Sequence, residues 1–289
     1  MDGFTVEPVE GLRSPVVVIA FMGWSDTGTV TVDVARHLVD AYDATRFLEV
    51  DPEDYYVFTD TRPMVSVNEA GIREITWPMN EAFWAHIPGS EHDLVVVSGV
   101  EPNLRWRTFS DQLSDAVASL GPSLVCTLVA RPAATPHTRP IPVTGSAADP
   151  ALARKFGLGR SMYQGPTGII GVVHDVLRRK DVPLISLAAG VPHYLNVAEN
   201  PPATMALLRA LEPMLGFAPT LGNLERDGVD FVEKVEEASQ GDNQIGDYVR
   251  ALEEQYNESA PAEIEPPPSE LSADDVLRDV EDLLRGGGD

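Results

Sequence analysis

Cysteine is almost absent from this chain of 289 residues, and basic residues are scarce. The one cysteine, Cys126, excludes an internal disulfide and the Cys-rich patterns of zinc sites, and it is typical of a reducing compartment. Lys and Arg number 21 against 45 Asp and Glu, which gives a formal net charge of −24. Because nucleic-acid binding requires basic surfaces, we expect no nucleic-acid partner.

Long apolar segments are also missing. No apolar run approaches the roughly 18 residues of a membrane span. The first residues, MDGFTVEPVEG, carry acids before any basic residue and no apolar stretch, so we expect no secretory signal. The sequence therefore predicts a cytoplasmic protein without a membrane partner.

Common catalytic signatures are absent as well. There is no G-x-S-x-G, no Gly-Lys-Ser/Thr of a phosphate-binding loop and no H-x-x-x-H. We expect no metal and no cofactor, and none of these motifs favours an enzyme. The segment 163–168 precedes a predicted helix, whose free N–H groups can bind an anion. A tight turn with Thr167 as the helix cap is the interpretation that we favour there.

Four short apolar runs are the main positive feature of the sequence. They cover residues 15–21, 94–97, 123–129 and 184–187, and each is followed at once by an unusual loop rich in Gly, Pro or charge. In an open α/β sheet, loops that follow parallel strands emerge at one edge, where sites form. If these runs are parallel strands, the unusual chemistry of the chain converges on that edge.

The remaining pattern alternates strands and helices. A stripe of apolar residues four apart predicts a helix from Val30 to Tyr42, with Asp26 or Thr27 at its start, and a strand follows at 46–50. Residues 63–77 predict a hairpin. Further helices are predicted at 106–120, 167–180 and 202–215. The alternation predicts a three-layer α/β/α fold with a mostly parallel sheet.

The chain divides into three predicted parts: an α/β/α body at 1–222, an amphipathic helical extension at 223–260, and an acidic, Pro-rich linker with a short tail helix at 261–289. From Glu225 onward there are 20 acids and 5 basic residues. Solvated helix faces explain this charge more simply than docking to a basic partner. The tail helix docks on its own body, docks on another chain or frays, and the sequence does not separate these three.

Polar residues in the convergent loops allow two interpretations. In the first, His137 is an acid/base, Arg139 anchors an anion and Glu101 orients the histidine. In the second, these residues and Arg105 form a structural network that ties long loops together, and this is the interpretation that we favour.

Five loop segments, read in order, resemble one known family. They are GWSDTG at 23–28, EPN with Arg105-Trp106 at 101–106, HTRP running to VTG at 137–145, YQGPTG at 163–168 and VPHY at 191–194. Together they are similar to the bacterial branch of the proteasome assembly chaperone (PAC) family, over roughly residues 10–260. The residues that carry the resemblance are Gly23, Trp24, Asp26, Gly28, Glu101, Asn103, Arg105, Trp106, Thr144, Gly145, Gly165, Thr167, Gly168 and His193.

The resemblance implies a phosphorylase/hydrolase-like fold, a homo-oligomer and a non-catalytic assembly chaperone or scaffold with an unknown protein client. Proteasome-docking relatives can end in a hydrophobic residue, a tyrosine and one final residue. This chain ends in Gly286-Gly287-Gly288-Asp289, so we expect no docking through such a tail. The alternative hypothesis is a phosphorylase/hydrolase-like enzyme that acts on a small anionic substrate through His137, Arg139 and Glu101.

Overall fold

A computed structural model describes residues 3–68, 70–195, 197–240 and 243–258 of the chain. Its centre is an eight-stranded sheet in the order β1-β3-β6-β7-β2-β8-β10-β9. The strands are β1 (Phe4–Val6), β2 (Val16–Met22), β3 (Thr45–Val50), β6 (Asn80–Ala85), β7 (Leu94–Val100), β8 (Leu124–Ala133), β9 (Val143–Ala147) and β10 (Leu184–Pro192).

The four predicted strands are adjacent and mutually parallel. They form the centre of the sheet as β7-β2-β8-β10. The prediction of a mostly parallel sheet is wrong at the flanks, where β1, β3, β6 and β9 all pair in antiparallel fashion. Parallel strands need long crossovers, and the helices supply these only for the central four.

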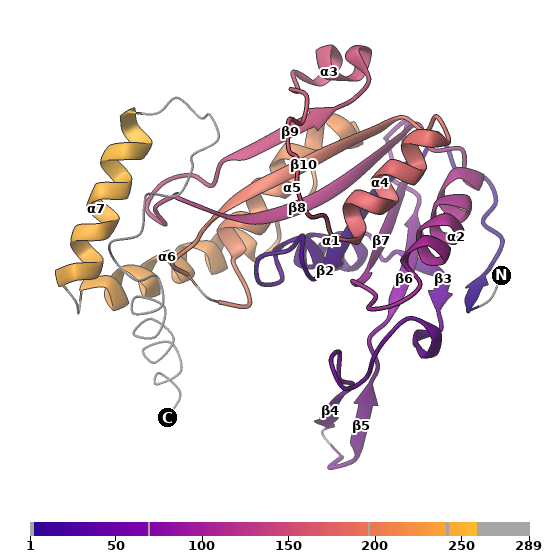
Figure 1. Ribbon diagram of the computed structural model, residues 1–289, viewed down its shortest axis with the longest axis horizontal. Helices are drawn as coiled ribbons and strands as arrows, with labels where there is room; N and C mark the ends of the chain where they lie inside the picture. Colours follow the sequence, from indigo (N-terminus) through magenta and orange to yellow (C-terminus); the bar gives the residue numbers. More distant parts are fainter. Residues whose placement is uncertain (1–2, 69, 196, 241–242, 259–289) are drawn as a thin grey trace.

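Helices cover both faces of the sheet, as the three-layer prediction requires (Figure 1). Helices α1 (Val30–Ala41) and α5 (Pro201–Leu215) pack on one face, and α2 (Trp106–Ser119) and α4 (Ile169–Arg179) pack on the other. The all-apolar run of β2 explains this arrangement, since Val16 and Val18 face the first pair of helices while Val17 and Ile19 face the second. The short helix α3 (Pro150–Phe156) follows β9.

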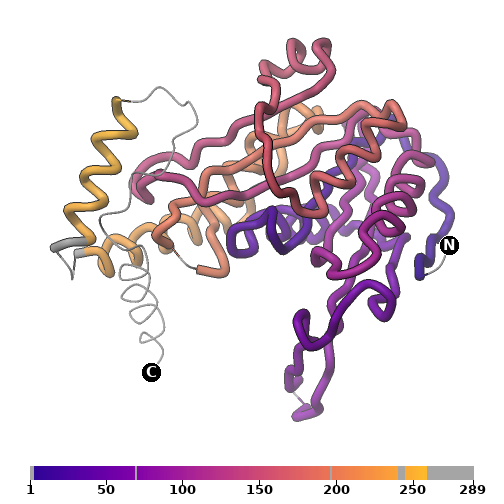
Figure 2. Tube along the Cα trace, in the orientation of Figure 1, coloured from indigo at the N-terminus to yellow at the C-terminus, as the bar shows by residue number. Residues whose placement is uncertain are grey.

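Helices α6 (Leu224–Gln240) and α7 (Asn243–Glu258) form the predicted helical extension. Their buried residues Val235, Ile245, Val249 and Leu252 pack against Tyr194 and other residues that follow β8 and β10. Figure 2 shows the same arrangement along the chain trace, with α6 and α7 beside the long ends of these strands. The apolar stripes of these two helices are thus covered by the chain's own body.

The hairpin predicted at 63–77 is present and stands apart from the main sheet. Strands β4 (Met64–Val67) and β5 (Arg73–Thr76) pair only with each other, and all their residues are exposed. Figure 1 shows the hairpin projecting from the body below the 3₁₀ helix η1 (Pro52–Asp54) and the edge that carries β3 and β6.

A difference in strand length divides the carboxyl edge into two levels. Strand β2 pairs with β8 only as far as Thr127, whereas β8 continues for six more residues to Ala133 beside β10. At about 3.3 Å per residue this extension adds about 20 Å. Strands β2 and β7 therefore end well short of β8 and β10. The loops after β2 and β7 form the inner level of the carboxyl edge, and the loops after β8 and β10 form its outer level.

None of the helices in the described ranges is long and apolar enough to cross a bilayer.

Candidate functional site

The inner level of the carboxyl edge is organised around Glu101, which follows β7. Its Oε2 atom accepts a hydrogen bond from the backbone N–H of Ile169, 2.7 Å away, at the start of α4. A Cβ added at Gly168 would lie 2.6 Å from the same oxygen, so only glycine allows this approach. Gly23 lies against the Glu101 side chain from the other side. Glu101, rather than Thr167, thus satisfies a free N–H group at the start of this helix.

Asp26 occupies the corresponding position on the opposite face of the sheet. Its carboxylate accepts from the backbone N–H of Thr31, 2.9 Å away, in the first turn of α1, as the sequence indicated. Burial raises the pKa of Asp26 to about 6, against the opposing effect of this hydrogen bond. Gly28 follows in a left-handed conformation with φ of +64°, under the carbonyls of Val197 and Ala198.

The segment after Glu101 makes local structural contacts. Asn103 Oδ1 accepts hydrogen bonds from the N–H of Val57 at 2.9 Å and from the hydroxyl of Thr61 at 3.0 Å. Arg105 has φ of 55° at the start of α2 and forms a 2.6 Å ion pair with Asp54. The indole N–H of Trp106 donates to the carbonyl of Pro102.

The outer level contains His137, which is buried between the body and α6. Its Nδ1 atom lies 2.7 Å from the hydroxyl of Tyr194, and its Nε2 atom lies 3.1 Å from Oε2 of Glu236. Burial lowers the pKa of His137, and the nearby Glu236 and Glu253 carboxylates only partly oppose this effect. The histidine therefore joins the loop after β8 to the helical extension.

Arg139 and His193 make the same kind of connection to α7. Arg139 Nη1 lies 3.0 Å from Oε1 of Glu253, and its Nε atom donates to Asn257. His193 Nε2 lies 2.7 Å from the hydroxyl of Tyr248. Both side chains hold the helical extension in place.

The structure does not assemble the proposed catalytic group of His137, Arg139 and Glu101. On the inner level, Glu101 accepts a hydrogen bond from the first turn of α4, and the carboxylate that lies next to His137 belongs to Glu236 instead. A single network that also includes Arg105 is not formed either, because its members contact separate partners. What the structure supports is the structural part of that interpretation: His137 and Arg139 tie a loop to helices.

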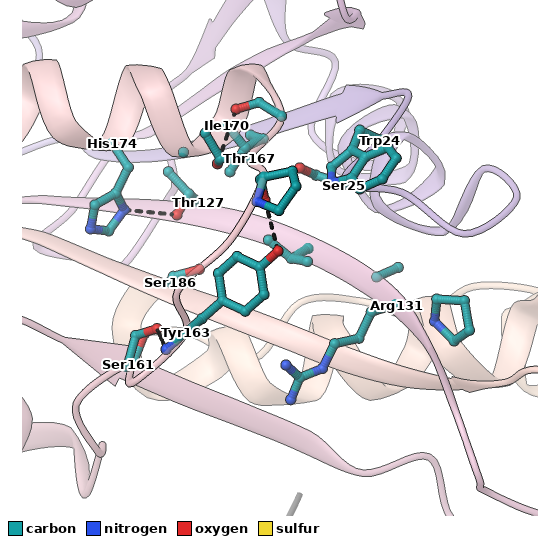
Figure 3. Close-up of a pocket in the computed structure, with 17 residues that line it drawn as sticks. Trp24, Ser25, Thr127, Arg131, Ser161, Tyr163, Thr167, Ile170, His174 and Ser186 are labelled. Atoms are coloured by element: carbon teal, nitrogen blue, oxygen red, sulfur yellow. Dashed lines mark hydrogen bonds between the residues drawn. The ribbon is translucent and has the colours of Figure 1, made fainter. Parts of the chain in front are cut away.

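A hollow of about 370 Å³ lies beside the inner level, between the first turns of α4, the strands β8 and β10, and the exposed segment 161–168 (Figure 3). Trp24, Ser25, Tyr163, Thr167 and Gly168 from the sequence-selected loops line it, together with residues that the sequence did not single out for function, including Thr127, Arg131, His174 and Ser186. We refer to it as the α4 cleft.

The remaining sequence-selected residues, Thr144, Gly145 and Gly165, have structural roles in the backbone. Thr144 and Gly145 are in β9, where they pair with Ala188 and Leu187 of β10, and a Cβ at Gly145 would meet Leu158. Gly165 lies in the exposed segment under the ring of Tyr163. Among the described residues, no three His, Cys, Asp or Glu side chains cluster to hold a metal ion.

Comparison with known proteins shows the family of the chain. Its sequence matches the PAC2 family over residues 20–239, which is most of its length. The chain belongs to the PAC2 family. A PAC2 family protein from Streptomyces avermitilis has 40% sequence identity and a TM-score of 0.74, over 81% of this chain and 99% of that one.

Two other solved structures illustrate the range of relatives. The Mycobacterium tuberculosis proteasome-assembly chaperone homologue has 39% identity and a TM-score of 0.72, over 81% of this PAC2 protein and 99% of that chain. PbaB, an archaeal proteasome activator from Pyrococcus furiosus, shares the fold at 18% identity and a TM-score of 0.62, over 81% and 97% of the two chains. No curated protein matches the chain.

Proposed function

We propose that this PAC2 protein has a chaperone-like role: it binds a partner protein and performs no chemistry on it. Family membership supports the proposal, as does the description of the 39%-identical relative as a proteasome-assembly chaperone homologue. The internal use of His137, Arg139 and Glu101 supports it too, because these were the residues from which an active site was expected.

The β4–β5 hairpin carries the proposal, because one of its faces is apolar and uncovered. Pairing of Val65 with Ile75, and of Val67 with Arg73, fixes which residues share that face. With Trp77 two positions beyond Ile75, the face displays the apolar residues Val65, Val67, Ile75 and Trp77, which are between 43% and 65% exposed, and it ends at Arg73 opposite Val67. We call these four residues the hairpin face.

The opposite side of the hairpin is mainly polar, with Ser66, Glu74 and Thr76 beside Met64. Such alternation is typical of a sheet whose apolar face is buried against another layer. The chain provides no layer here in the described residues, apart from the contact of Trp77 with Phe58 at 4.8 Å between ring centroids. A two-stranded hairpin is marginal alone in water, and an uncovered apolar face marks an interaction site.

Charge favours a protein surface as the partner of this face. Residues 62–77 contain two basic and two acidic residues, so the hairpin is neutral within a chain of net charge −24. Affinity at this place comes from burial of apolar area, which is the type of contact that an unassembled subunit offers. We assign the hairpin face to the protein client.

We further propose that the chain works as a homo-oligomer in the cytoplasm. Several copies would each project one hairpin, and multivalency raises the apparent affinity for a client that presents repeated subunits. Proteasome components are the first clients to test, because one relative is a proteasome-assembly chaperone homologue and another is an archaeal proteasome activator.

The test is a photo-crosslinker placed at position 65 in cells, with mass spectrometry of the captured protein and reconstitution from purified components. The double variant Val65→Lys/Ile75→Lys should lose at least about tenfold in affinity for the captured client. The matched control, Ser66→Lys/Thr76→Lys, adds the same charge to the other side of the same strands and should bind normally.

Equal binding by both variants would overturn the assignment of the hairpin face. Failure of the wild-type chain to bind any captured protein after purification would overturn the chaperone-like role. Loss of the oligomer in the Val65→Lys/Ile75→Lys variant would assign the face to self-association instead. Melting should be unchanged in both variants, since all four substituted side chains are exposed.

A further inference from the structure

Hydroxyl side chains form a row across the floor of the α4 cleft. Thr127 of β8 pairs in register with Ser186 of β10, and Ser186 pairs in register with Ser146 of β9. All three point to the face of the sheet that carries α4, because the residues next to them in each strand, such as Ile185, lie in the core on the opposite face. Neighbouring strands lie about 4.8 Å apart, so the row is about 10 Å long. We call Thr127, Ser186 and Ser146 the hydroxyl row.

Two hydroxyls of this row have no partner in the described ranges. The hydroxyl oxygens of Ser146 and Ser186 make no hydrogen bond there, and both remain accessible at the cleft. The third hydroxyl, that of Thr127, donates to the carbonyl of Ile185 at 3.2 Å and lies 3.3 Å from Nδ1 of His174 (Figure 3). An occupant without hydrogen-bonding groups would leave the two serine hydroxyls desolvated and unpaired, which costs free energy for each. A purely apolar ligand is therefore disfavoured.

The cleft also offers no free charge to a ligand. The chain holds 45 acidic residues, yet none of the 17 described residues that line the cleft is acidic. Arg131, which also lines it, already takes part in an interaction within the chain. Burial, assisted by Arg178, lowers the pKa of His174, so the ring is neutral at pH 7. A charged ligand would lose hydration here without gaining an opposite charge, so the cleft favours an uncharged ligand.

The backbone of the strands around the cleft is already paired. Strand β10 lies between β8 and β9, and β8 pairs with β2 as far as Thr127. Beyond that point, both backbone groups of Ala130 bond to the loop after β2, and Pro132 has no N–H to donate. Gly159 bridges to the outer edge of β9. Binding of a peptide by strand addition is therefore disfavoured, and side chains are left to recognise the ligand.

The exposed end of the cleft is aromatic. Trp24 and Tyr163 line it and are 69% and 66% exposed. The hydroxyl of Tyr163 donates to the carbonyl of Pro166 at 2.7 Å, which fixes the position of the ring (Figure 3). The cleft thus combines hydroxyl groups at its floor with aromatic rings at its exposed end. A sugar ring matches both parts, because its faces are apolar and its rim carries hydroxyls.

We propose that the α4 cleft binds an uncharged sugar, meaning a single polyhydroxylated ring without a phosphate, carboxylate or amine group. Ser146 and Ser186 of the hydroxyl row exchange hydrogen bonds with the sugar hydroxyls. Tyr163 and Trp24 cover the apolar face of the ring. The volume of about 370 Å³ is at the lower end of the range of ligand pockets and accommodates one such ring.

The experiment is isothermal titration calorimetry of the full chain with glucose, galactose and mannose. Glucuronate and glucosamine serve as charged counterparts, and cyclohexanol serves as an apolar ring with a single hydroxyl. We expect at least one neutral sugar to bind with a Kd below about 1 mM, and at least about tenfold more tightly than each of the three control ligands. The charged ligands test the preference for an uncharged occupant, and cyclohexanol tests the contribution of the hydroxyl row.

Variants then place the sugar in the cleft. Ser146→Ala/Ser186→Ala and Tyr163→Ala should each weaken binding at least about tenfold. Ser66→Ala/Thr76→Ala, which removes two hydroxyls from the exposed hairpin, is the matched control and should bind normally. Tyr163 is exposed, so its variant tests the site even if the double variant in the sheet fails to fold.

Three results would overturn the proposal: no binding of a neutral sugar at about 10 mM ligand, binding of a control ligand as tight as that of the best sugar, or folded cleft variants that bind as the wild type does. The proposal is independent of the hairpin face. Val65→Lys/Ile75→Lys should bind the sugar normally, so failure of one proposal leaves the other standing.

Discussion

His137 Nε2 lies 3.1 Å from Oε2 of Glu236, and this contact joins the loop after β8 to α6 across 99 positions of sequence. The imidazole is almost fully buried, with Tyr194 on its other nitrogen. A histidine in this position behaves as a structural connector whose protonation opposes folding, because burial lowers its pKa.

The first prediction concerns the pH dependence of this connection. The lowered native pKa of His137 means that the unfolded chain, with a pKa near 6.5, binds more protons. The stabilising contribution is therefore complete above about pH 6.5 and is lost as the pH falls toward the native value. His137→Gln removes the titration.

Urea unfolding of wild type and His137→Gln at about pH 5.5 and 7.5 checks this prediction. The stability of the wild type relative to the variant should increase with pH. A difference that stays constant over this range would show that His137 has an ordinary pKa. Comparison with the variant is needed because His174 has a pKa shifted in the same direction.

Arg139→Ala should cost about 1 kcal/mol of stability and affect α7 locally. The pair with Glu253 is partly exposed, with side-chain exposures of 31% and 25%, so the loss of about 3–5 kcal/mol typical of a buried pair is not expected. Hydrogen exchange should rise in α7 while the central sheet stays protected. Arg250→Ala, which removes only an exposed pair within α7, is the control and should have little effect.

Asp26→Asn should show the opposite pH dependence to His137→Gln. Because the native pKa of Asp26 is raised to about 6, its favourable contribution is complete below the unfolded value and is lost as the pH rises through 6. The stability of Asp26→Asn relative to wild type should therefore increase between about pH 4 and 7, by a free energy on the order of 2–3 kcal/mol. Parallel stability curves for the two proteins would contradict this assignment.

Gly28→Ala should destabilise the fold by about 2–4 kcal/mol. An added Cβ would lie 2.4 Å from the carbonyl oxygen of Ala198 and 2.6 Å from that of Val197, and backbone atoms cannot move aside cheaply. Gly89 has a similar φ of +78° but no atom within 4 Å of the added Cβ. Gly89→Ala should therefore lower the free energy of unfolding by only about 1 kcal/mol. Equal losses of stability in both variants would show that backbone strain, and not the contact with the carbonyls, explains the effect at Gly28.

The central strands could be predicted from sequence because they are buried on both faces and read as continuous apolar runs. Strand β9 (VTGSA) and β6 (NEAFWA) were missed, since each is defined by its antiparallel neighbour more than by its own residues. The convergence of the loops followed from topology and is confirmed. Their separation into two levels was not predictable, because it depends on how far β8 and β10 extend beyond β2 and β7.

The partners of the loop residues were beyond the reach of sequence reasoning. Glu236 and Glu253 belong to helices whose acids were interpreted as solvated faces, and nothing local distinguishes them from neighbouring glutamates. Similarly, Thr127 and His174 lie in a predicted strand and a predicted helix, and they contribute to a cleft only after those elements pack together. The hairpin at 63–77 was predictable as an element, but its isolation from the main sheet was not.

The last prediction concerns residues 261–289, which lie outside the described residues. Pro266-Pro267-Pro268 cannot continue a helix, and the flanking acids favour a hydrated linker. Behind it, Val276, Val280, Leu283 and Leu284 form an apolar stripe at helical spacing, which is typical of an element that docks in a groove.

Deletion of residues 261–289 should therefore leave the melting temperature nearly unchanged and alter either oligomer size or client capture. Light scattering and the crosslinking assay measure the two, and the full chain with Val280→Asp/Leu283→Asp should reproduce the deletion if the apolar stripe is responsible. Unfolding of the truncated chain would show that the tail belongs to the core. An unchanged oligomer together with unchanged capture would exclude a docking role, because an apolar stripe that binds a partner must lose that partner when it is removed.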